Sequence, residues 1–403
     1  MTMSWPAADW INEGAKLIAH DPQLGVRLLR QGVRLGPDLP LGWFNLGLAL
    51  HQQRRITEAI RAYRLSLEHP SGHELSLINN LAQDLLLSGA MAEGWRLYEQ
   101  RRALEKHTFF HEALGFSWSG PEDPRGRPDT LLLVSEQGFG DTLQFSRFGL
   151  ELQELGYQVE LFCQRPLVPL LQQCSDLHAV SYAWEPSRLS GTVAWVPLMS
   201  LPHRLGRPAA PWPYPSGYLR VGPELVARAA VWRERLQRRP GHSLIGLHWQ
   251  GNPKHEGSLY SRGRSMPFEV WGELIPQLPR KLEFVSLQKG EGSEQFRRDL
   301  GLPFVSGQDV FSQSMDFLDT AAVVQQCDLV LSADSGVVHL AGAMGVPTWV
   351  ALPWIPEWRW GLSGQTTPWY GSFRLYRQPS EGDWRSVVRA MSDELPKILP
   401  LGV

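Results

Sequence analysis

The chain has 403 residues, which is enough for two or three domains with substantial cores. Its residues are 43% hydrophobic and 20% charged, and the formal net charge is −2, a composition typical of soluble globular proteins. Binding to nucleic acid over a broad surface needs a basic protein, so no nucleic-acid partner is expected.

Cysteine usage and hydropathy give the expected compartment. Cys163, Cys174 and Cys327 have no metal-ligand spacing and are odd in number, so free thiols in a reducing environment are expected. The N-terminal residues lack a basic region followed by an apolar core, and no apolar run approaches the ~20 residues that span a bilayer. We therefore expect a cytoplasmic protein with no transmembrane segment, and leave open whether it associates with the inner face of a membrane.

Residues 4–105 are predicted to be helical, with a repeating pattern. The clearest unit, residues 42–70, has large and small residues at tetratricopeptide spacing: Trp43, Leu46, Gly47, Ala59, Tyr63 and a closing Pro70. A second copy follows at residues 77–101, and a degenerate first copy precedes it near residues 15–37. Three repeats are about the minimum for a self-supporting stack. A generic helical bundle is the competing interpretation.

The rest of the chain alternates between short apolar runs and helical segments, which predicts an α/β fold. Residues 115–129 are rich in Gly and Pro and are predicted to be a linker. A second Pro-rich passage, residues 208–220, separates two α/β series. The predicted domains are a helical repeat domain (1–114), an N-terminal Rossmann-like domain (115–221) and a C-terminal Rossmann-like domain (222–403).

Residues 329–349 form the most informative segment. A buried strand at 329–332 runs through a polar turn into a small-residue helix at 337–344, with Asp334, Ser335, Gly336 and His339 at or near the turn. The N–H groups of such a helix start favour an anion, which predicts a phosphorylated ligand at the carboxyl end of a parallel sheet. The alternative is an ordinary strand–turn–helix unit whose turn is only capped by Asp334 and Ser335.

A second polar turn follows the strand that begins at residue 130. Gly138 and Gly140 let the backbone turn sharply and approach a ligand, and Asp141 stands near the start of the next helix. Asp141 could act as a general base toward an acceptor hydroxyl, or simply cap that helix. The spacing is not that of a nicotinamide-binding glycine motif.

Basic and amide side chains follow two further predicted strands. Lys254 and Arg264 lie in a polar loop after residue 250 and could offset leaving-group charge. A solvated surface loop is the alternative. Gln288 and Lys289 end another strand and would share a cleft with Ser335 in a parallel sheet. No cluster has metal-ligand spacing, so neither a metal nor another cofactor is expected.

Two smaller predictions concern packing. Asp319 and Thr320 are expected to cap a helix at residues 321–327. Tryptophans gather late in the chain and could be sugar-stacking platforms or core residues: Trp349, Trp354, Trp358, Trp360, Trp369 and Trp384.

Taken together, several segments resemble the heptosyltransferase-like glycosyltransferases of family 9, in the form fused to tetratricopeptide repeats. The likeness keeps its order over most of residues 42–385 and is carried by residues 136–148, 248–255, 262–267, 286–290, 316–353, 357–361 and 368–378. Ser335 stands where threonine is common, Glu357 replaces a usual aspartate, and Gly371 replaces a proline.

The resemblance implies a GT-B fold, in which two Rossmann-like domains bind a nucleotide-sugar donor and an acceptor. It implies inverting transfer without a metal, with Asp141 as general base and with Lys254 and Arg264 stabilising the departing nucleotide. Donor-side residues by the same resemblance are Gly138, Gly140, Gln288, Lys289, Asp334, Ser335, Gly336 and His339.

The helical repeats could recruit a protein or glycan acceptor, or serve only as a structural extension; a homo-oligomer is left open. Two other functions remain as alternatives. One is a scaffold whose α/β half has lost activity, and the other is a nucleotide-sugar epimerase, which would need no acceptor.

Overall fold

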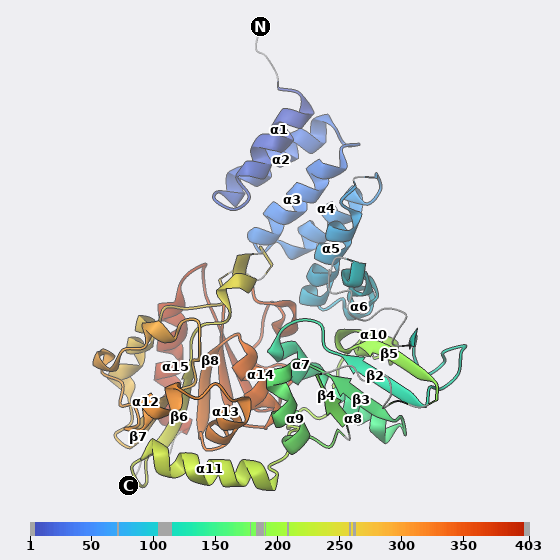
Figure 1. The fold of residues 1–403 in the computed structure, drawn as a ribbon. Helices are drawn as coiled ribbons and strands as arrows, with labels where there is room; N and C mark the ends of the chain where they lie inside the picture. The colour runs from blue at the N-terminus through green and yellow to red at the C-terminus, as the bar shows by residue number, and fades with distance from the viewer. Residues whose placement is uncertain are drawn as a thin grey trace. The chain divides into compact units, whose positions relative to one another are not determined.

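The computed structural model describes residues 5–70, 72–103, 115–177, 179–182, 189, 191–207, 209–257, 259–260 and 263–398. The chain divides into two compact units, each with its own packing (Figure 1). The first holds residues 1–108 together with two later segments, 256–262 and 355–363. The second holds residues 109–255, 263–354 and 364–403. The predicted domain boundary at residue 114 lies outside the described residues.

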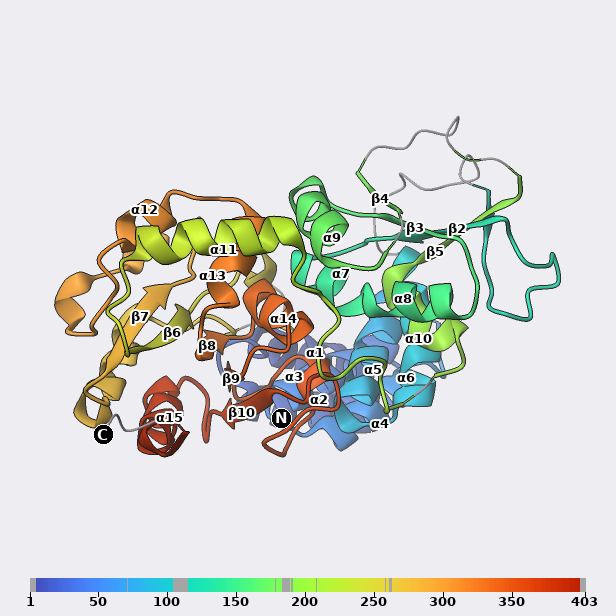
Figure 2. The ribbon, with the colours of Figure 1, turned by 90° about the horizontal axis from the view of Figure 1, so that it is seen from below.

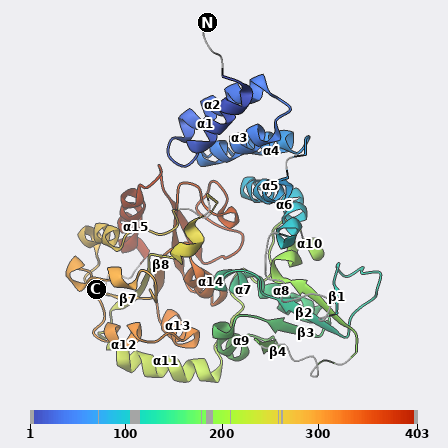
Figure 3. The same cartoon turned by 45° about the horizontal axis from the view of Figure 1, so that its top comes forward.

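The first unit is helical. Consecutive helices pack against each other in pairs, the first with the second, the third with the fourth and the fifth with the sixth (Figure 3). Gly47 permits one of these contacts, because a Cβ on it would lie 2.3 Å from Cε1 of Tyr63. The helices are α1 (Ala7–Lys16), α2 (Pro22–Leu35), α3 (Pro40–Gln52), α4 (Ile56–Ser66), α5 (Glu74–Ser88), α6 (Met91–Tyr98) and the 3-10 helix η1 (Glu99–Ala103).

The second unit contains two sheets whose strands all pair in parallel. The first sheet has the order β1-β5-β2-β3-β4. Its strands are β1 (Phe116–Ser117), β2 (Thr130–Val134), β3 (Val159–Phe162), β4 (Ala179–Ser181) and β5 (Val193–Pro197). The helices around it are α7 (Phe139–Phe145), α8 (Arg147–Glu154), η4 (Arg165–Leu167), α9 (Val168–Cys174), η6 (Leu198–Ser200) and α10 (Leu201–Arg204).

The linker predicted at residues 115–129 is wrong in one respect. Phe116 and Ser117 pair with Ala194 and Trp195 of β5, and Trp118 is buried. Gly and Pro residues mark the turns of this passage correctly, but a two-residue strand is too short to show an alternating pattern. The passage therefore forms the edge of the first sheet.

The second sheet has the order β10-β9-β8-β6-β7 and is also fully parallel. Helices α11, α12 and α13 cover one face, and η8 and α15 cover the other (Figure 2). The strands are β6 (Ser243–His248), β7 (Leu282–Ser286), β8 (Leu329–Ala333), β9 (Thr348–Leu352) and β10 (Phe373–Arg377). The helices are α11 (Pro223–Leu236), η7 (Pro253–Gly257), η8 (Phe268–Gln277), η9 (Ser293–Gln295), η10 (Arg298–Leu300), α12 (Gln308–Ser312), α13 (Phe317–Val324), α14 (Gly336–Ala343) and α15 (Trp384–Ile398). The 3-10 helix η11 (Trp358–Trp360) lies in the segment 355–363, which belongs to the helical unit.

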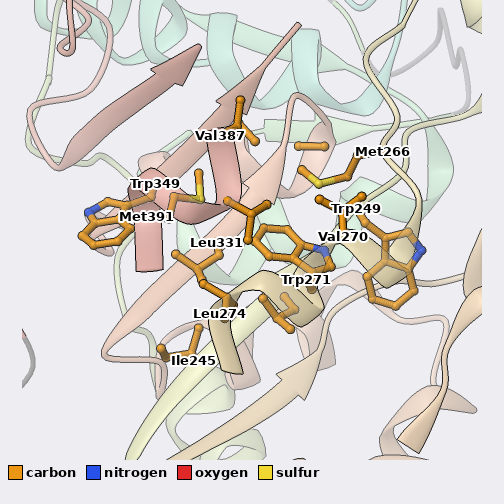
Figure 4. Close-up of a cluster of buried hydrophobic side chains, with 14 of the residues drawn as sticks. Ile245, Trp249, Met266, Val270, Trp271, Leu274, Leu331, Trp349, Val387 and Met391 are labelled. Atoms are coloured by element: carbon orange, nitrogen blue, oxygen red, sulfur yellow. The ribbon is translucent and has the colours of Figure 1, made fainter. Parts of the chain in front are cut away.

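The main core of the second sheet lies between the strands and the pair η8 and α15 (Figure 4). Leu331 of β8, Trp271 of η8 and Met391 of α15 are all fully buried there. Of the six late tryptophans, five are also buried, which makes them packing residues and not exposed stacking platforms: Trp349, Trp358, Trp360, Trp369 and Trp384.

A helical N-terminal region followed by two parallel, Rossmann-like α/β sheets agrees with the fold class predicted from the sequence. The prediction that Asp319 and Thr320 cap a helix is wrong. Asp316 is the cap, and its Oδ1 accepts a hydrogen bond of 2.8 Å from the backbone N–H of Leu318. Asp319, one turn later, binds Arg228 and the hydroxyl of Ser314 instead.

Candidate functional site

The order of the second sheet defines its ligand-binding edge. Strands β7 and β8 lie on opposite sides of β6, so the winding of the chain reverses between β6 and β8. Open α/β sheets bind ligands outside the carboxyl ends of the strands at such a switch point. His248 ends β6, while Asp334 and Ser335 follow β8, so these three residues flank the reversal.

Ser335 and His248 meet at this edge. The Ser335 hydroxyl lies 3.1 Å from Nδ1 of His248 and 3.4 Å from the hydroxyl of Ser332. All three residues and Asp334 are buried, and burial lowers the pKa of His248 to about 3, so its imidazole is neutral at pH 7. Ser335 precedes α14 in an extended conformation, and its side chain makes no capping hydrogen bond. The capping role considered for Ser335 is therefore absent.

The turn that contains Gly138 and Gly140 contacts the turn that precedes α14. A Cβ placed on Gly140 would lie 2.7 Å from Cδ2 of His339 and 3.3 Å from Cα of Gly336, so α7 and α14 touch at the level of backbone and ring. Asp141 is partly buried, and its Oδ2 accepts a hydrogen bond of 2.8 Å from the N–H of Gly138. The carboxylate thus fixes its own glycine turn, which is the cap-like role considered for it, and stands one residue from the contact with α14.

Two further residues of the site, Tyr370 and Arg147, were not among the site residues predicted from the sequence. Nδ1 of His339 lies 3.0 Å from the hydroxyl of the buried Tyr370, which holds the imidazole in place. The guanidinium of Arg147, on α8, stacks 4.6 Å from the centre of the Tyr370 ring. In the sequence, Arg147 is distinguished only as the one charged residue of the segment 143–150.

Arg147 joins the two α/β halves of the second unit. It is fully buried, and its Nη1 donates to the carbonyl oxygens of Trp369 at 2.8 Å and Pro213 at 3.2 Å. Its Nε donates to the carbonyl oxygen of Gln144 at 2.9 Å. A buried charge is tolerated only when it is hydrogen-bonded, so these carbonyl groups and the stacked rings stabilise the guanidinium.

The loop that carries Lys254 and Arg264 is held at both of its ends by the core of the second sheet. Trp249 and Met266 are buried in the core of the second sheet, and the N–H of Met266 donates to the carbonyl oxygen of Trp249 at 3.0 Å (Figure 4). Between them, Lys254 is exposed on η7 and Arg264 is partly buried. Among the described residues, Nε of Arg264 is buried with no hydrogen-bond partner. Arg262, the first residue of the segment 262–267, lies outside the described residues.

Gln288 and Lys289 have structural partners. The Gln288 amide accepts from the N–H groups of Trp249 and Gln250 and donates to the carbonyl oxygens of Gln250 and Glu291. Nζ of Lys289 donates to the carbonyl oxygen of Phe311 and lies 3.4 Å from the centre of that ring. Burial lowers the pKa of Lys289 to about 7. The structure therefore uses Gln288 to shape the turn after β6 and directs Lys289 toward Phe311.

In the part of the chain that the structure describes, no three His, Cys, Asp or Glu side chains gather as metal ligands would. No described helix is both long and apolar enough to cross a bilayer. The three cysteines are buried and free.

Known proteins and one family model resemble parts of this chain. The model of glycosyltransferase family 9 (heptosyltransferase) matches residues 312–352, which include β8, the Asp334–Ser335 turn and α14. "Protein FlbA" of Caulobacter vibrioides is 26% identical over 389 residues, or 91% of this chain. The chain spans 63% of the length of that curated relative.

Solved structures of two transferases also resemble the chain. A family 9 glycosyl transferase from Veillonella parvula is 10% identical, with a TM-score of 0.48, over 68% of this chain and 96% of that one. The E. coli ADP-heptose lps heptosyltransferase II is 12% identical, with a TM-score of 0.46, over 67% of this chain and 98% of that one. The family match over residues 312–352 supports a glycosyltransferase.

Proposed function

We propose that the chain is an inverting, metal-independent glycosyltransferase that moves a sugar from a nucleotide-sugar to a hydroxyl group of a protein or glycan acceptor. The observation that carries the proposal is the contact of Gly140 with Gly336 and His339, which brings the carboxyl edges of two parallel sheets together. The family match supports it, because it covers one of the two turns that meet there.

The donor diphosphate would lie at the start of α14. The first N–H groups of a helix lack intrahelical partners, and the helix dipole favours negative charge at that end. Lys254 and Arg264, from the loop after β6, would add positive charge. The buried Nε of Arg264 has no hydrogen-bond partner in the described chain, and a phosphate oxygen would provide one. Asp334 and His339 would face the sugar.

Asp141 would act as the general base. Its carboxylate would take the proton of the acceptor hydroxyl while that oxygen attacks the anomeric carbon. The bond from this carbon to the diphosphate oxygen breaks, and its electron pair leaves with the nucleotide diphosphate. The hydrogen bond from Gly138 to Oδ2 holds the carboxylate in a fixed orientation for this step.

The helical first unit would recruit the acceptor through tetratricopeptide repeats. Tight packing at Gly47 and Tyr63 supports this repeat assignment, because small residues at that spacing let paired helices approach closely. Three free, buried cysteines fit the reducing cytoplasm, which is the compartment we propose.

The test replaces Asp141 with asparagine, which keeps an oxygen acceptor for the N–H of Gly138 but removes the base. We expect transfer to fall by roughly 10²–10⁴-fold, the usual contribution of a general base. Affinity for the nucleoside diphosphate, followed by thermal shift, should stay unchanged. Unchanged turnover would contradict the assignment of Asp141.

The donor is identified first, by thermal shift against ADP, GDP, UDP and CDP and their sugar derivatives. If none of them stabilises the chain, the scaffold alternative is favoured. If a sugar nucleotide is converted without any acceptor, the epimerase alternative is favoured.

A further inference from the structure

Tyr260 belongs to the segment that follows β6 along the chain, yet it packs within the helical unit. Its neighbours there are three buried side chains from three different helices, His51 of α3, Tyr63 of α4 and Asp84 of α5. We name these three residues the tyrosine socket. The segment also bonds to α3 next to the socket, where Nε2 of Gln52 donates to the carbonyl oxygen of Leu259 at 3.2 Å.

The contacts in the tyrosine socket are specific. The hydroxyl groups of Tyr260 and Tyr63 lie 2.8 Å apart, and the ring centres of Tyr260 and His51 are 4.0 Å apart. Nδ1 of His51 lies 2.7 Å from Oδ1 of Asp84. Asp84 and Tyr63 are completely buried, and His51 is 2% exposed.

Burying a carboxylate, an imidazole and a phenol in the core of a helical stack costs free energy of folding. Burial raises the pKa of Asp84, while hydrogen bonds from His51 and Tyr260 oppose that rise. Nε2 of His51 and Oδ2 of Asp84 are buried without a hydrogen-bond partner in the described chain, and apolar residues would pack the same helices at lower cost. Because the polar groups of three helices converge on one side chain from a distant segment, we read the socket as a site built to hold Tyr260.

We propose that Tyr260 is a positioning residue for the donor site, and that its seat in the tyrosine socket fixes the segment that carries Lys254 and Arg264. This inference rests on the proposed function. The base of the segment is already fixed, since Met266 bonds to Trp249 and the hydroxyl of Ser265 accepts from the N–H of Gly251 at 3.2 Å. Tyr260 is a second anchor of the same segment, six residues after Lys254 and four before Arg264, and it restricts the chain between them. Less ordering is then needed when the donor binds.

A second segment shows the same pattern. Residues 355–363 follow β9, also from the carboxyl edge of the second sheet, and pack with the helical unit. The ring of Trp358 meets that of Trp95 edge-on at a centre distance of 5.1 Å, and the guanidinium of Arg54 donates to the carbonyl oxygen of Leu362. The helical unit therefore includes two segments that each follow a strand of the second sheet along the chain, one after β6 and one after β9.

The experiment measures amide hydrogen exchange of a peptide spanning residues 250–265, together with binding of the nucleoside diphosphate that most stabilises the chain among ADP, GDP, UDP and CDP. Tyr260→Ala removes the anchor. Tyr260→Phe keeps the ring against His51 and loses only the hydroxyl. Tyr182→Ala, at a half-exposed tyrosine directly after β4, is the matched control.

We expect Tyr260→Ala to speed exchange of the peptide and to weaken binding of the nucleoside diphosphate, each by roughly threefold to tenfold. Tyr260→Phe should show a smaller change, and Tyr182→Ala none. In a transfer assay, Tyr260→Ala should raise the donor KM and leave the acceptor KM unchanged. Circular dichroism of the variants confirms that the helices are intact.

Unchanged exchange in Tyr260→Ala overturns the anchor, whether or not the chain transfers sugar. Faster exchange with unchanged nucleoside diphosphate affinity overturns the positioning role. A wild-type chain that binds a nucleoside diphosphate but transfers nothing contradicts the proposed function alone, because the exchange and binding measurements still decide the role of Tyr260.

Discussion

Gly140 lies against His339 so closely that a Cβ on residue 140 would stand 2.7 Å from Cδ2 of the imidazole. The ring has little freedom to move away, because its Nδ1 lies 3.0 Å from the hydroxyl of Tyr370, and both residues are buried. The same Cβ would also lie 3.3 Å from Cα of Gly336, at the start of α14. The contact between α7 and α14 therefore depends on the absence of a side chain at residue 140.

Replacing Gly140 with alanine should separate these two helices. Overpacking of a tight contact costs about 1–3 kcal/mol, so we expect a lower melting temperature. We also expect a loss of transfer larger than the loss of nucleoside diphosphate affinity, since the shift moves Asp141 away from the donor site. Differential scanning fluorimetry and steady-state kinetics measure the two effects.

Gly371→Ala is the matched control for this substitution. A Cβ on Gly371 would meet only the carbonyl oxygen of Pro215, at an ordinary 3.6 Å. Its melting temperature and turnover should stay close to those of the wild type. If Gly140→Ala behaves in the same way as this control, then close packing of α7 on α14 is not required.

The elements around the donor edge could be predicted because their signals are local. The strand expected at residues 329–332 is β8 (Leu329–Ala333), and the helix expected at 337–344 is α14 (Gly336–Ala343). A run of buried apolar residues followed by a Ser-Gly turn specifies this unit without help from the rest of the chain.

The partners of single side chains could not be predicted, because they depend on contacts between distant residues. Gln288 follows a strand as a ligand-binding residue would, but its amide is used by the backbone of the turn after the neighbouring strand β6. Arg147 and Tyr260 resemble ordinary helix and loop residues in the sequence. Their roles appear only when residues about 200 positions away pack against them.

Arg147→Met should destabilise the second unit. The substitution removes the buried guanidinium's hydrogen bonds to the carbonyl oxygens of Gln144, Pro213 and Trp369. We expect a loss of about 2–4 kcal/mol in the free energy of unfolding. Arg147→Lys should recover only part of it, because an ammonium group does not have the planar fork of a guanidinium. Urea denaturation followed by tryptophan fluorescence measures both variants.

The control is Arg220→Met, at an exposed arginine paired with Asp176. Surface ion pairs contribute little, so its stability should lie within about 0.5 kcal/mol of the wild type. Equal losses in Arg147→Met and Arg220→Met would show that Arg147 does not hold the two α/β halves together.

Ser335→Ala should weaken binding of the nucleoside diphosphate identified by thermal shift. The hydroxyl lies at the start of α14 and makes no capping bond, and it would donate to a phosphate oxygen while accepting from the Nδ1–H of His248. We expect affinity to fall roughly threefold to tenfold, the effect of one lost hydrogen bond. Ser335→Thr keeps the hydroxyl and should bind as the wild type does. Calorimetric titration compares the three proteins, and equal affinity for Ser335→Ala would remove Ser335 from the donor site.

His248 should make the stability of the chain depend on pH. Burial lowers its pKa from an ordinary 6.5 to about 3, so the unfolded chain binds a proton between these values and the folded chain does not. Its contribution to stability is therefore complete above pH 6.5 and is lost as the pH falls toward 3.

Between pH 7 and pH 5, this single group should reduce the free energy of unfolding by about 2 kcal/mol. His248→Asn keeps a polar partner for the hydroxyl of Ser335 but does not titrate, so it should lose less stability over the same interval. Urea denaturation of both proteins at pH 5 and pH 7 gives the difference between their losses. A difference near zero would mean that the imidazole takes up its proton in the folded chain as readily as in the unfolded one, and that the edge between β6 and β8 admits water.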